Sequence, residues 1–197
     1  MNLPSLHLNP REFIRDIIYT YNVDRVIKFS SDDDEINLEH FYNIGLSHAK
    51  RGKPHDAIFY FDKVLAVEPN HVNALANKGN ALGKLGKYDV AIVTYDLALK
   101  IKPDHIICLL NKGLALQYLA RYDDATSCYD KILSQEPSNA SALYHKACTK
   151  SLQRDASTAL ELLEQAIRID SQFATKASSD KDFDSIRDDT RFKALTA

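Results

Sequence analysis

Glycine and proline are scarce in this sequence, with six of each among 197 residues. An all-β fold needs many turns, and these two residues commonly form them, so the composition favours helices. The longest apolar runs are too short to cross a bilayer. Residues 1–10 also lack the cationic start and apolar core of a secretory signal. These absences predict a helical, cytoplasmic protein with no membrane partner.

Neither sign of charge dominates the chain. Lysine and arginine total 25, aspartate and glutamate total 27, and the formal net charge is −2. The two signs are interspersed, and no basic stripe of the kind that binds nucleic acid is present. We therefore expect no nucleic-acid partner.

Motifs that carry chemistry are missing too. The three cysteines, Cys108, Cys128 and Cys148, have no metal-ligand spacing, and we expect them to be reduced and mostly buried. The sequence has no zinc pattern, no phosphate-binding glycine loop and no Ser/His/Asp motif. It therefore predicts a protein that is not an enzyme and that uses no cofactor or metal.

What the chain does contain is an internal repeat. Pro69, Pro103 and Pro137 follow one another at intervals of 34 positions. Four further columns keep the same phase. They are Gly45, Gly79, Gly113 and Ala147; Ala57, Ala91, Ala125 and Ala159; Phe61, Tyr95, Tyr129 and Leu163; and Leu65, Leu99, Leu133 and Ile167. Five columns in phase without an insertion indicate a stack of similar structural units.

Each unit has the pattern of two helices. Leu109, Gly113 and Leu116 share one face of a first helix, while Ala125 and Tyr129 share one face of a second. Gly52 and Gly86 occupy the turn between the two helices, where glycine tolerates a positive φ. The proline after the second helix stops it, and we expect Asn70, Asp104 and Ser138 to help cap the helix that follows.

These motifs resemble the tetratricopeptide repeat (TPR) family. Residues 77–82, Asn-Lys-Gly-Asn-Ala-Leu, match its first-helix pattern, and residues 88–91, Tyr-Asp-Val-Ala, match its second. The resemblance implies an all-α superhelix of four helix-turn-helix repeats with N- and C-terminal helical caps. The repeats are residues 38–71, 72–105, 106–139 and 140–171, together 38–171. Lys78, Lys112 and Lys146 stand where the family usually has Leu, and we expect their ammonium groups to reach water.

The two ends of the chain are predicted to cap the array, because a terminal helix pair needs cover. Residues 172–197 resemble an ending common after bacterial and archaeal TPR arrays, and Phe183, Ile186, Phe192 and Leu195 are expected to cover the last pair. Residues 1–29 are predicted to form an amphipathic helical segment, with a capping pattern at Asn9 to Glu12. Residues 30–37 are predicted to form an acidic linker.

The resemblance also implies where a ligand binds, since the first helices of a TPR array line its concave face. The predicted peptide-binding groove consists of Tyr42, Asn43, Leu46, Asn77, Asn80, Ile107, Leu110, Asn111, Leu114, Tyr118, Tyr144, His145 and Cys148. Asn43, Asn77 and Asn111 form a ladder that can bind a peptide backbone or serve within the array. The apolar members predict an interface, with cover by another part of the chain as the alternative.

TPR proteins that clamp the terminal carboxylate of a chaperone place lysine and arginine at set positions of this face. Here the lysine and arginine places hold Tyr42, Ile107 and Asn111, or Ala76, Ser141 and His145 when counted from the second repeat. With no cation at any of these clamp places, the clamp's charge-assisted capture of a carboxylate is missing. We therefore do not expect a carboxylate-clamp chaperone partner.

Three functional hypotheses follow. The first is a non-catalytic adaptor or scaffold that binds a peptide or helix of another protein in the groove. The second is a self-associating structural protein, a homo-oligomer or a chain whose groove is occupied by its own residues 1–29. The third, an enzyme subunit, depends on His145 and Cys148, which are neighbours on one helix.

Overall fold

The structure, a computed structural model, describes residues 38–197. Along the chain the helices are α2 (Leu38–Lys50), α3 (Pro54–Val67), α4 (Val72–Lys84), α5 (Tyr88–Ile101), α6 (Ile106–Tyr118), α7 (Tyr122–Gln135), α8 (Ala140–Leu152), α9 (Ala156–Ile169), α10 (Gln172–Ser179), the 3-10 helix η2 (Lys181–Ile186) and α11 (Thr190–Thr196).

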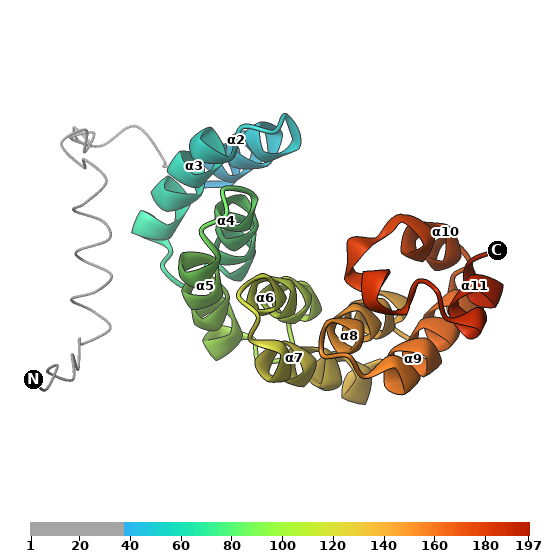
Figure 1. The fold of residues 1–197 in the computed structure, drawn as a ribbon. Helices are drawn as coiled ribbons and strands as arrows, with labels where there is room; N and C mark the ends of the chain where they lie inside the picture. The colour runs from blue at the N-terminus through green and yellow to red at the C-terminus, as the bar shows by residue number, and fades with distance from the viewer. Residues whose placement is uncertain (1–37) are drawn as a thin grey trace, which may run out of the picture. The chain divides into compact units, whose positions relative to one another are not determined.

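Helices α2 to α9 form four pairs that stack in chain order. Each helix packs against its pair partner and against the next pair. The described residues form an arc in which α4, α6 and α8 lie on the inner side and α5, α7 and α9 on the outer side (Figure 1). Over these residues the predicted all-α TPR superhelix is confirmed. The predicted segment 1–29 and linker 30–37 lie outside the residues that the structure describes.

Close packing within each pair explains the repeated glycine. A Cβ atom added to Gly79 would lie 2.4 Å from the ring of Tyr95, and one added to Gly113 would lie 2.5 Å from the ring of Tyr129. In the fourth pair Ala147 faces the column position of Leu163, and both are fully buried. An aromatic ring at one position therefore requires glycine at the other. Where leucine replaces the ring, alanine fits in place of glycine.

The turn inside each pair has the same backbone conformation in all four copies. Gly52 and Gly86 have φ of 69° and 72°, and Ala120 and Arg154, at the equivalent places, have φ of 56° and 62°. The left-handed region costs roughly 1–2 kcal/mol for a residue with a Cβ. The last two repeats keep this turn although glycine is absent from it, so packing of the pair determines the conformation.

The caps of the first helices lie one residue later than predicted. His71 and His105 accept hydrogen bonds through Nδ1 from the backbone amides of Ala74 and Cys108. Asn139 accepts through Oδ1 from the amide of Ala142, at 3.0 Å. The expected caps Asn70, Asp104 and Ser138 are thus wrong by one position, because the helices begin at Val72, Ile106 and Ala140. A histidine ring nitrogen does here what asparagine does in the last copy.

The lysines of the first helices do not end in water as predicted. Lys78, Lys112 and Lys146 form ion pairs with Asp62, Asp96 and Asp130, at 2.5, 2.6 and 2.6 Å. The aspartates recur at the repeat spacing on the second helix of the preceding pair. The same Lys–Asp contact therefore joins each repeat to the next. This contact explains why lysine replaces leucine at this place.

The C-terminal segment completes the array. Phe183, Ile186 and Phe192 are 0%, 6% and 2% exposed and share a core cluster with α8 and α9, against which Leu195 packs. Figure 1 shows α10 folding back over the inner side of α8. The segment thus covers the last pair as expected and also covers part of the inner face. No helix of residues 38–197 is both long enough and apolar enough to span a membrane.

Candidate functional site

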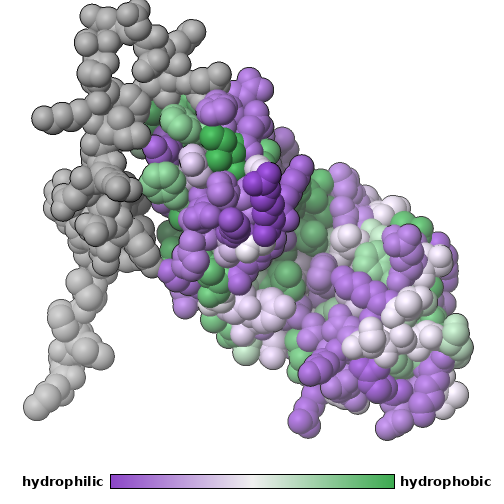
Figure 2. All heavy atoms as spheres, turned by 90° about the horizontal axis from the view of Figure 1, so that it is seen from above, coloured by the Kyte–Doolittle hydropathy of each residue, from purple (hydrophilic) through white to green (hydrophobic). Residues whose placement is uncertain are grey.

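The inner face is hollowed over the first three repeats. A groove of about 670 Å³ runs across α2, α4 and α6 and reaches the start of α5. Its lining is Leu46, Ala49, Lys50, Pro54, Asn77, Asn80, Ala81, Gly83, Lys84, Tyr88, Tyr95, Asn111, Leu114, Ala115 and Tyr118. Seen from above, the described residues show hydrophobic surface in a hollow between hydrophilic side chains (Figure 2). The site therefore combines an apolar floor with polar edges.

Asparagine side chains connect neighbouring repeats along this groove. Asn77 donates through Nδ2 to the Tyr42 hydroxyl at 3.0 Å. Asn80 accepts through Oδ1 from both the Tyr95 hydroxyl and Asn111 Nδ2, each at 2.7 Å. Part of the predicted ladder therefore has a structural role. The Nδ2 of Asn80 and the Oδ1 atoms of Asn77 and Asn111 make no hydrogen bond within residues 38–197, so they can serve a ligand.

The network ends in the third repeat, where Leu114 replaces Asn80 at the equivalent place. The hydroxyl of Tyr129 is buried there without a hydrogen-bond partner among the described residues. At the end of α6, the ring of Tyr118 stacks on that of Tyr88, with centroids 4.6 Å apart and planes 10° from parallel. Tyr118 is 62% exposed. The third repeat therefore offers a ligand an aliphatic and an aromatic surface.

The fourth repeat presents no groove, because the C-terminal segment occupies its inner face. Asp182 accepts a hydrogen bond from Gln117 Nε2 at 2.7 Å, and Asp180 accepts one from the Tyr144 hydroxyl at 2.6 Å. The Ser185 hydroxyl donates to the Ser151 carbonyl at 3.1 Å. These contacts hold η2 and the residue before it against α6 and α8. The groove therefore ends near Tyr118.

The predicted groove residues divide into three groups. Those that line the open groove are Leu46, Asn77, Asn80, Asn111, Leu114 and Tyr118. Four residues lie on the inner side but outside the lining. Tyr42 accepts a hydrogen bond from Asn77, and Leu110 packs on the core. Asn43 and Ile107 are exposed. Those against or beneath the C-terminal segment are Tyr144, His145 and Cys148. Tyr144 and Cys148 are 0% and 1% exposed, which corrects their assignment: they are core residues.

Several lining residues were missing from the predicted set, among them Lys50, Lys84 and Tyr88. Lys50 and Lys84 stand one repeat apart at the ends of α2 and α4, in the same column as Tyr118, so the repeat phase was a sufficient signal for them. Tyr88 is the first residue of a second helix, and its ring reaches the groove by stacking on Tyr118. No sequence signal marks that contact.

The only pair considered for catalysis has an unsuitable environment. Burial, followed by the nearby carboxylates of Asp180 and Asp182, raises the pKa of the Cys148 thiol far above its ordinary value. Burial, with Lys176 nearby, lowers the pKa of His145 to about 4. A reactive cysteine needs a lowered pKa that favours the thiolate. These surroundings therefore favour a neutral, unreactive thiol.

Cys148 also forms a small cluster with Asp180 and Asp182, in which one ligand atom from each residue lies within 4.8 Å of the others. The interactions of these groups are already internal. Asp180 accepts from Tyr144 and contacts Cys148 Sγ at 3.9 Å, while Asp182 accepts from Gln117. Burial and Asp180 raise the pKa of the Asp182 carboxyl. The cluster is explained by its part in anchoring the C-terminal segment.

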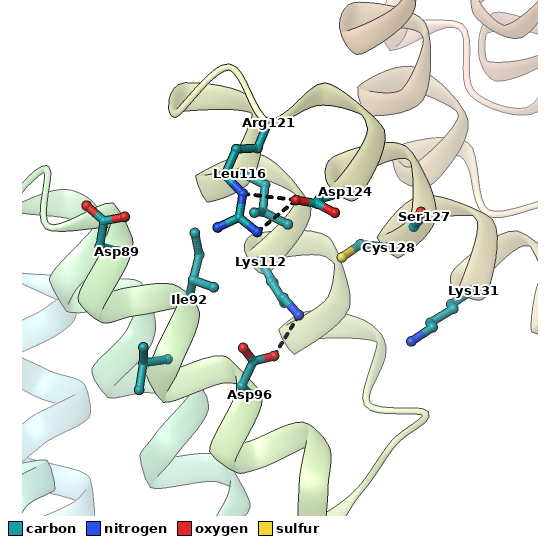
Figure 3. Close-up of a pocket in the computed structure, with 11 residues that line it drawn as sticks. Asp89, Ile92, Asp96, Lys112, Leu116, Arg121, Asp124, Ser127, Cys128 and Lys131 are labelled. Atoms are coloured by element: carbon teal, nitrogen blue, oxygen red, sulfur yellow. Dashed lines mark hydrogen bonds and ion pairs between the residues drawn. The ribbon is translucent and has the colours of Figure 1, made fainter. Parts of the chain in front are cut away.

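A second cleft lies on the outer side, between α5 and α7, with α6 at its base (Figure 3). Its volume is about 420 Å³. Lys112 is paired with Asp96 there, and Arg121 with Asp124, as the dashed lines show. Two ion pairs thus neutralise four of its charged groups within the chain, and the cleft is a less suitable ligand site than the groove.

Family models match the repeat region. Residues 110–172 match the model described as tetratricopeptide repeat, and residues 50–132 match the model described as anaphase-promoting complex, cyclosome, subunit 3. No curated protein matches the chain.

Solved structures share the fold at low sequence identity. A MamA structure from Desulfovibrio magneticus RS-1 is 22% identical over 80% of this chain and 88% of its own, with a TM-score of 0.68. The first TPR domain of human RPAP3 is 24% identical over 61% of this chain and 94% of its own, with a TM-score of 0.56. The first TPR of Spaghetti (RPAP3), bound to the HSP90 peptide SRMEEVD, is 22% identical over 61% of this chain and 96% of its own, with a TM-score of 0.58. The matched models and the stacked helix pairs identify a tetratricopeptide repeat protein, and the solved structures share its fold.

Proposed function

We propose that this protein is a non-catalytic interaction module that binds an extended peptide of a partner protein in the groove of its first three repeats. The observation that carries the proposal is the groove itself, which has an apolar floor and side-chain amide atoms that make no hydrogen bond within residues 38–197. A ligand site commonly combines apolar walls with a few placed polar groups. The related RPAP3 domain has been solved with a peptide of HSP90, which supports peptide binding as a mode for this fold.

Peptide backbone suits the free groups of the groove. Asn80 offers a donor, and Asn77 and Asn111 offer acceptors, so the groove can satisfy both the N–H and the C=O groups of an extended chain. Leu46 on α2 and Leu114 on α6 also line the groove and can contact apolar side chains. Binding of an extended segment therefore uses both polar and apolar groups of the lining.

Gly83 provides a test that separates binding from folding. It lies in the groove lining, and an added Cβ would meet no atom within 4 Å. Gly83→Leu should improve helix propensity by about 1 kcal/mol while filling the groove. A random peptide library displayed on phage would be selected on the full chain, and the peptides measured by calorimetry.

We expect the selected peptides to lose about tenfold or more in affinity for Gly83→Leu, a change of roughly 1.4 kcal/mol, without a fall in melting temperature. Gly83→Ala is the matched control, because its methyl group leaves the groove open and should preserve affinity. Peptides that bind Gly83→Leu as well as the wild type do so elsewhere, and a library that yields no binder contradicts the proposal.

Self-association remains the second candidate, because one part of this chain already fills one part of the inner face. In that case residues 1–29 would occupy the open groove, within one chain or from a second copy. A chain lacking residues 1–29 should then bind library peptides that the full chain refuses, or change its mass in light scattering. Equal binding and equal mass for the two chains would exclude this candidate.

A further inference from the structure

We propose, resting on the function proposed above, that the open groove selects acidic peptides and that Lys50 and Lys84 pair with ligand carboxylates. Both lysines are exposed and both line the groove. They end the first helices of consecutive repeats, so they stand as two equivalent cations along one edge.

The charge of the lining is of one sign. Among its residues the charged side chains are Lys50 and Lys84, and none is acidic. The chain as a whole has slightly more acidic than basic residues, so this segregation is not a consequence of composition. A cleft lined by one sign of charge attracts ligands of the opposite sign.

The same helices show what happens to lysines that the fold itself uses. Lys78 on α4 and Lys112 on α6 each pair with an aspartate of the preceding repeat, as does Lys146 on α8. Within residues 38–197, Lys50 and Lys84 form no ion pair and no side-chain hydrogen bond. One column of lysines is therefore neutralised by the array, and the other is left for a partner.

The closed end of the inner face shows an acidic segment bound in place. Residues 180–184 read Asp-Lys-Asp-Phe-Asp, and the first two aspartates accept hydrogen bonds from Tyr144 and Gln117 of the inner helices. Phe183, between the carboxylates, is fully buried. At its closed end, this face therefore binds carboxylates of its own chain beside a buried apolar side chain.

Geometry sets the expected motif. First helices of consecutive repeats are about 10 Å apart, roughly a helix diameter. An extended chain advances about 3.3 Å per residue, so two carboxylates about three residues apart match the two lysines. Leu114 and the stacked Tyr88–Tyr118 pair lie farther along the groove and fit an apolar or aromatic side chain beyond the acidic pair.

The test uses the phage-displayed random library on the full chain and on the double variant Lys50→Glu/Lys84→Glu. Lys100→Glu/Lys102→Glu is the matched control, since it makes the same change of charge at exposed positions outside the groove lining. We expect wild type and control to select peptides rich in Asp and Glu. The groove variant should select basic peptides, and it should bind the acidic ones about tenfold more weakly or worse, because reversal turns two attractions into two repulsions.

Neutral or basic peptides selected by wild type, or acidic peptides whose affinity is unchanged by the groove reversal, overturn the inference. If such peptides are still blocked by Gly83→Leu, the proposed peptide-binding function stands and only the choice of ligand is wrong. If no peptide is selected, both fail. Should the acidic residues 30–37 be the natural occupant, Asp32→Asn/Asp33→Asn/Asp34→Asn in the full chain should strengthen binding of the acidic peptides.

Discussion

The two ends of the inner face are built on the same repeat and have different surfaces. Over the first three repeats the face is open, and small side chains such as Ala49 and Gly83 leave a groove. Over the fourth repeat it is closed, since Gln117 binds Asp182 within η2 and Tyr144 binds Asp180 just before η2. A few side chains therefore determine whether the inner face of a TPR array forms an open groove or an internal interface. The arrangement of the helices is the same in both cases.

The difference also shows what a C-terminal cap can do. A cap must cover the outer surface of the last helix pair, which α11 does against α9. Here α10 and η2 additionally turn inward and bury Tyr144 and Cys148. The usable groove is shortened as a result, and its remaining polar groups are the asparagines and lysines of the first three repeats.

The largest expected effect comes from removing the anchor of the closed end. Phe183 is fully buried, and its ring lies 5.8 Å from that of Tyr144 and 5.5 Å from that of Phe192, centroid to centroid. Phe183→Ala should destabilise the fold by about 3–5 kcal/mol through lost burial and the cavity left behind. Urea unfolding, followed by circular dichroism, measures this.

Phe59→Ala is the control for that change, because Phe59 is 52% exposed and its loss should matter much less. If Phe183→Ala costs no more than Phe59→Ala, the C-terminal segment is not an integral part of the fold. The comparison between a closed and an open end would then be wrong.

A smaller effect concerns acid stability, which the closed end should lower. His145 is kept neutral in the fold by burial and by Lys176, with its pKa lowered to about 4, while Asp180 opposes the shift. Below about pH 6.5 the unfolded chain takes up a proton at this histidine and the folded chain does not until about pH 4. Stability is therefore complete above this window and is lost as the pH falls through it.

The variant His145→Asn removes that titration and inserts the residue that Asn77 and Asn111 provide in the open repeats. Between pH 7 and pH 4.5 it should lose roughly 2–3 kcal/mol less stability than wild type, from about 1.4 kcal/mol per unit of pKa shift. Urea titrations at the two pH values measure the difference. Parallel losses in the two proteins would mean that His145 is not held neutral.

Sequence periodicity was sufficient for the fold. A glycine at the place of Gly79 and an aromatic ring at the place of Tyr95 require two helices in close contact. Recurrence of these positions at the repeat spacing requires a stack of such helix pairs. The sequence also placed Phe183 and Phe192 in the C-terminal cover. It misplaced the helix caps by one residue, because Asn70, Asp104 and Ser138 are all common cap residues and directly precede the true caps His71, His105 and Asn139.

The candidate site was predictable only in part. Leu46, Asn80 and Leu114 follow from their places in the repeat, and they line the groove. The closure over Tyr144 and Cys148 did not follow, because it depends on a hydrogen bond between Gln117 and Asp182, which are 65 positions apart and belong to no common motif. Contacts between a repeat and a non-repeating segment carry no periodic signal.

The smallest expected effect compares the two columns of lysines directly. The Lys112–Asp96 pair is partly exposed, with 23% and 45% of the two side chains accessible, so it should contribute about 0.2–1 kcal/mol. A double-mutant cycle with Lys112→Met and Asp96→Ala measures that coupling by urea unfolding. Lys84→Met should change stability by even less, since Lys84 has no ion pair within residues 38–197.

The two lysines should exchange roles when peptide binding is measured. Lys84→Met should weaken the library-selected acidic peptides, whereas Lys112→Met should not, because Lys112 lines the outer cleft and its charge is taken by Asp96. A coupling energy near zero for Lys112 and Asp96 would mean that this ion pair does not stabilise the fold. A peptide affinity that is unchanged by Lys84→Met would mean that Lys84 does not bind the ligand. The two repeated lysine positions would then not differ in role, although the helices that carry them are alike.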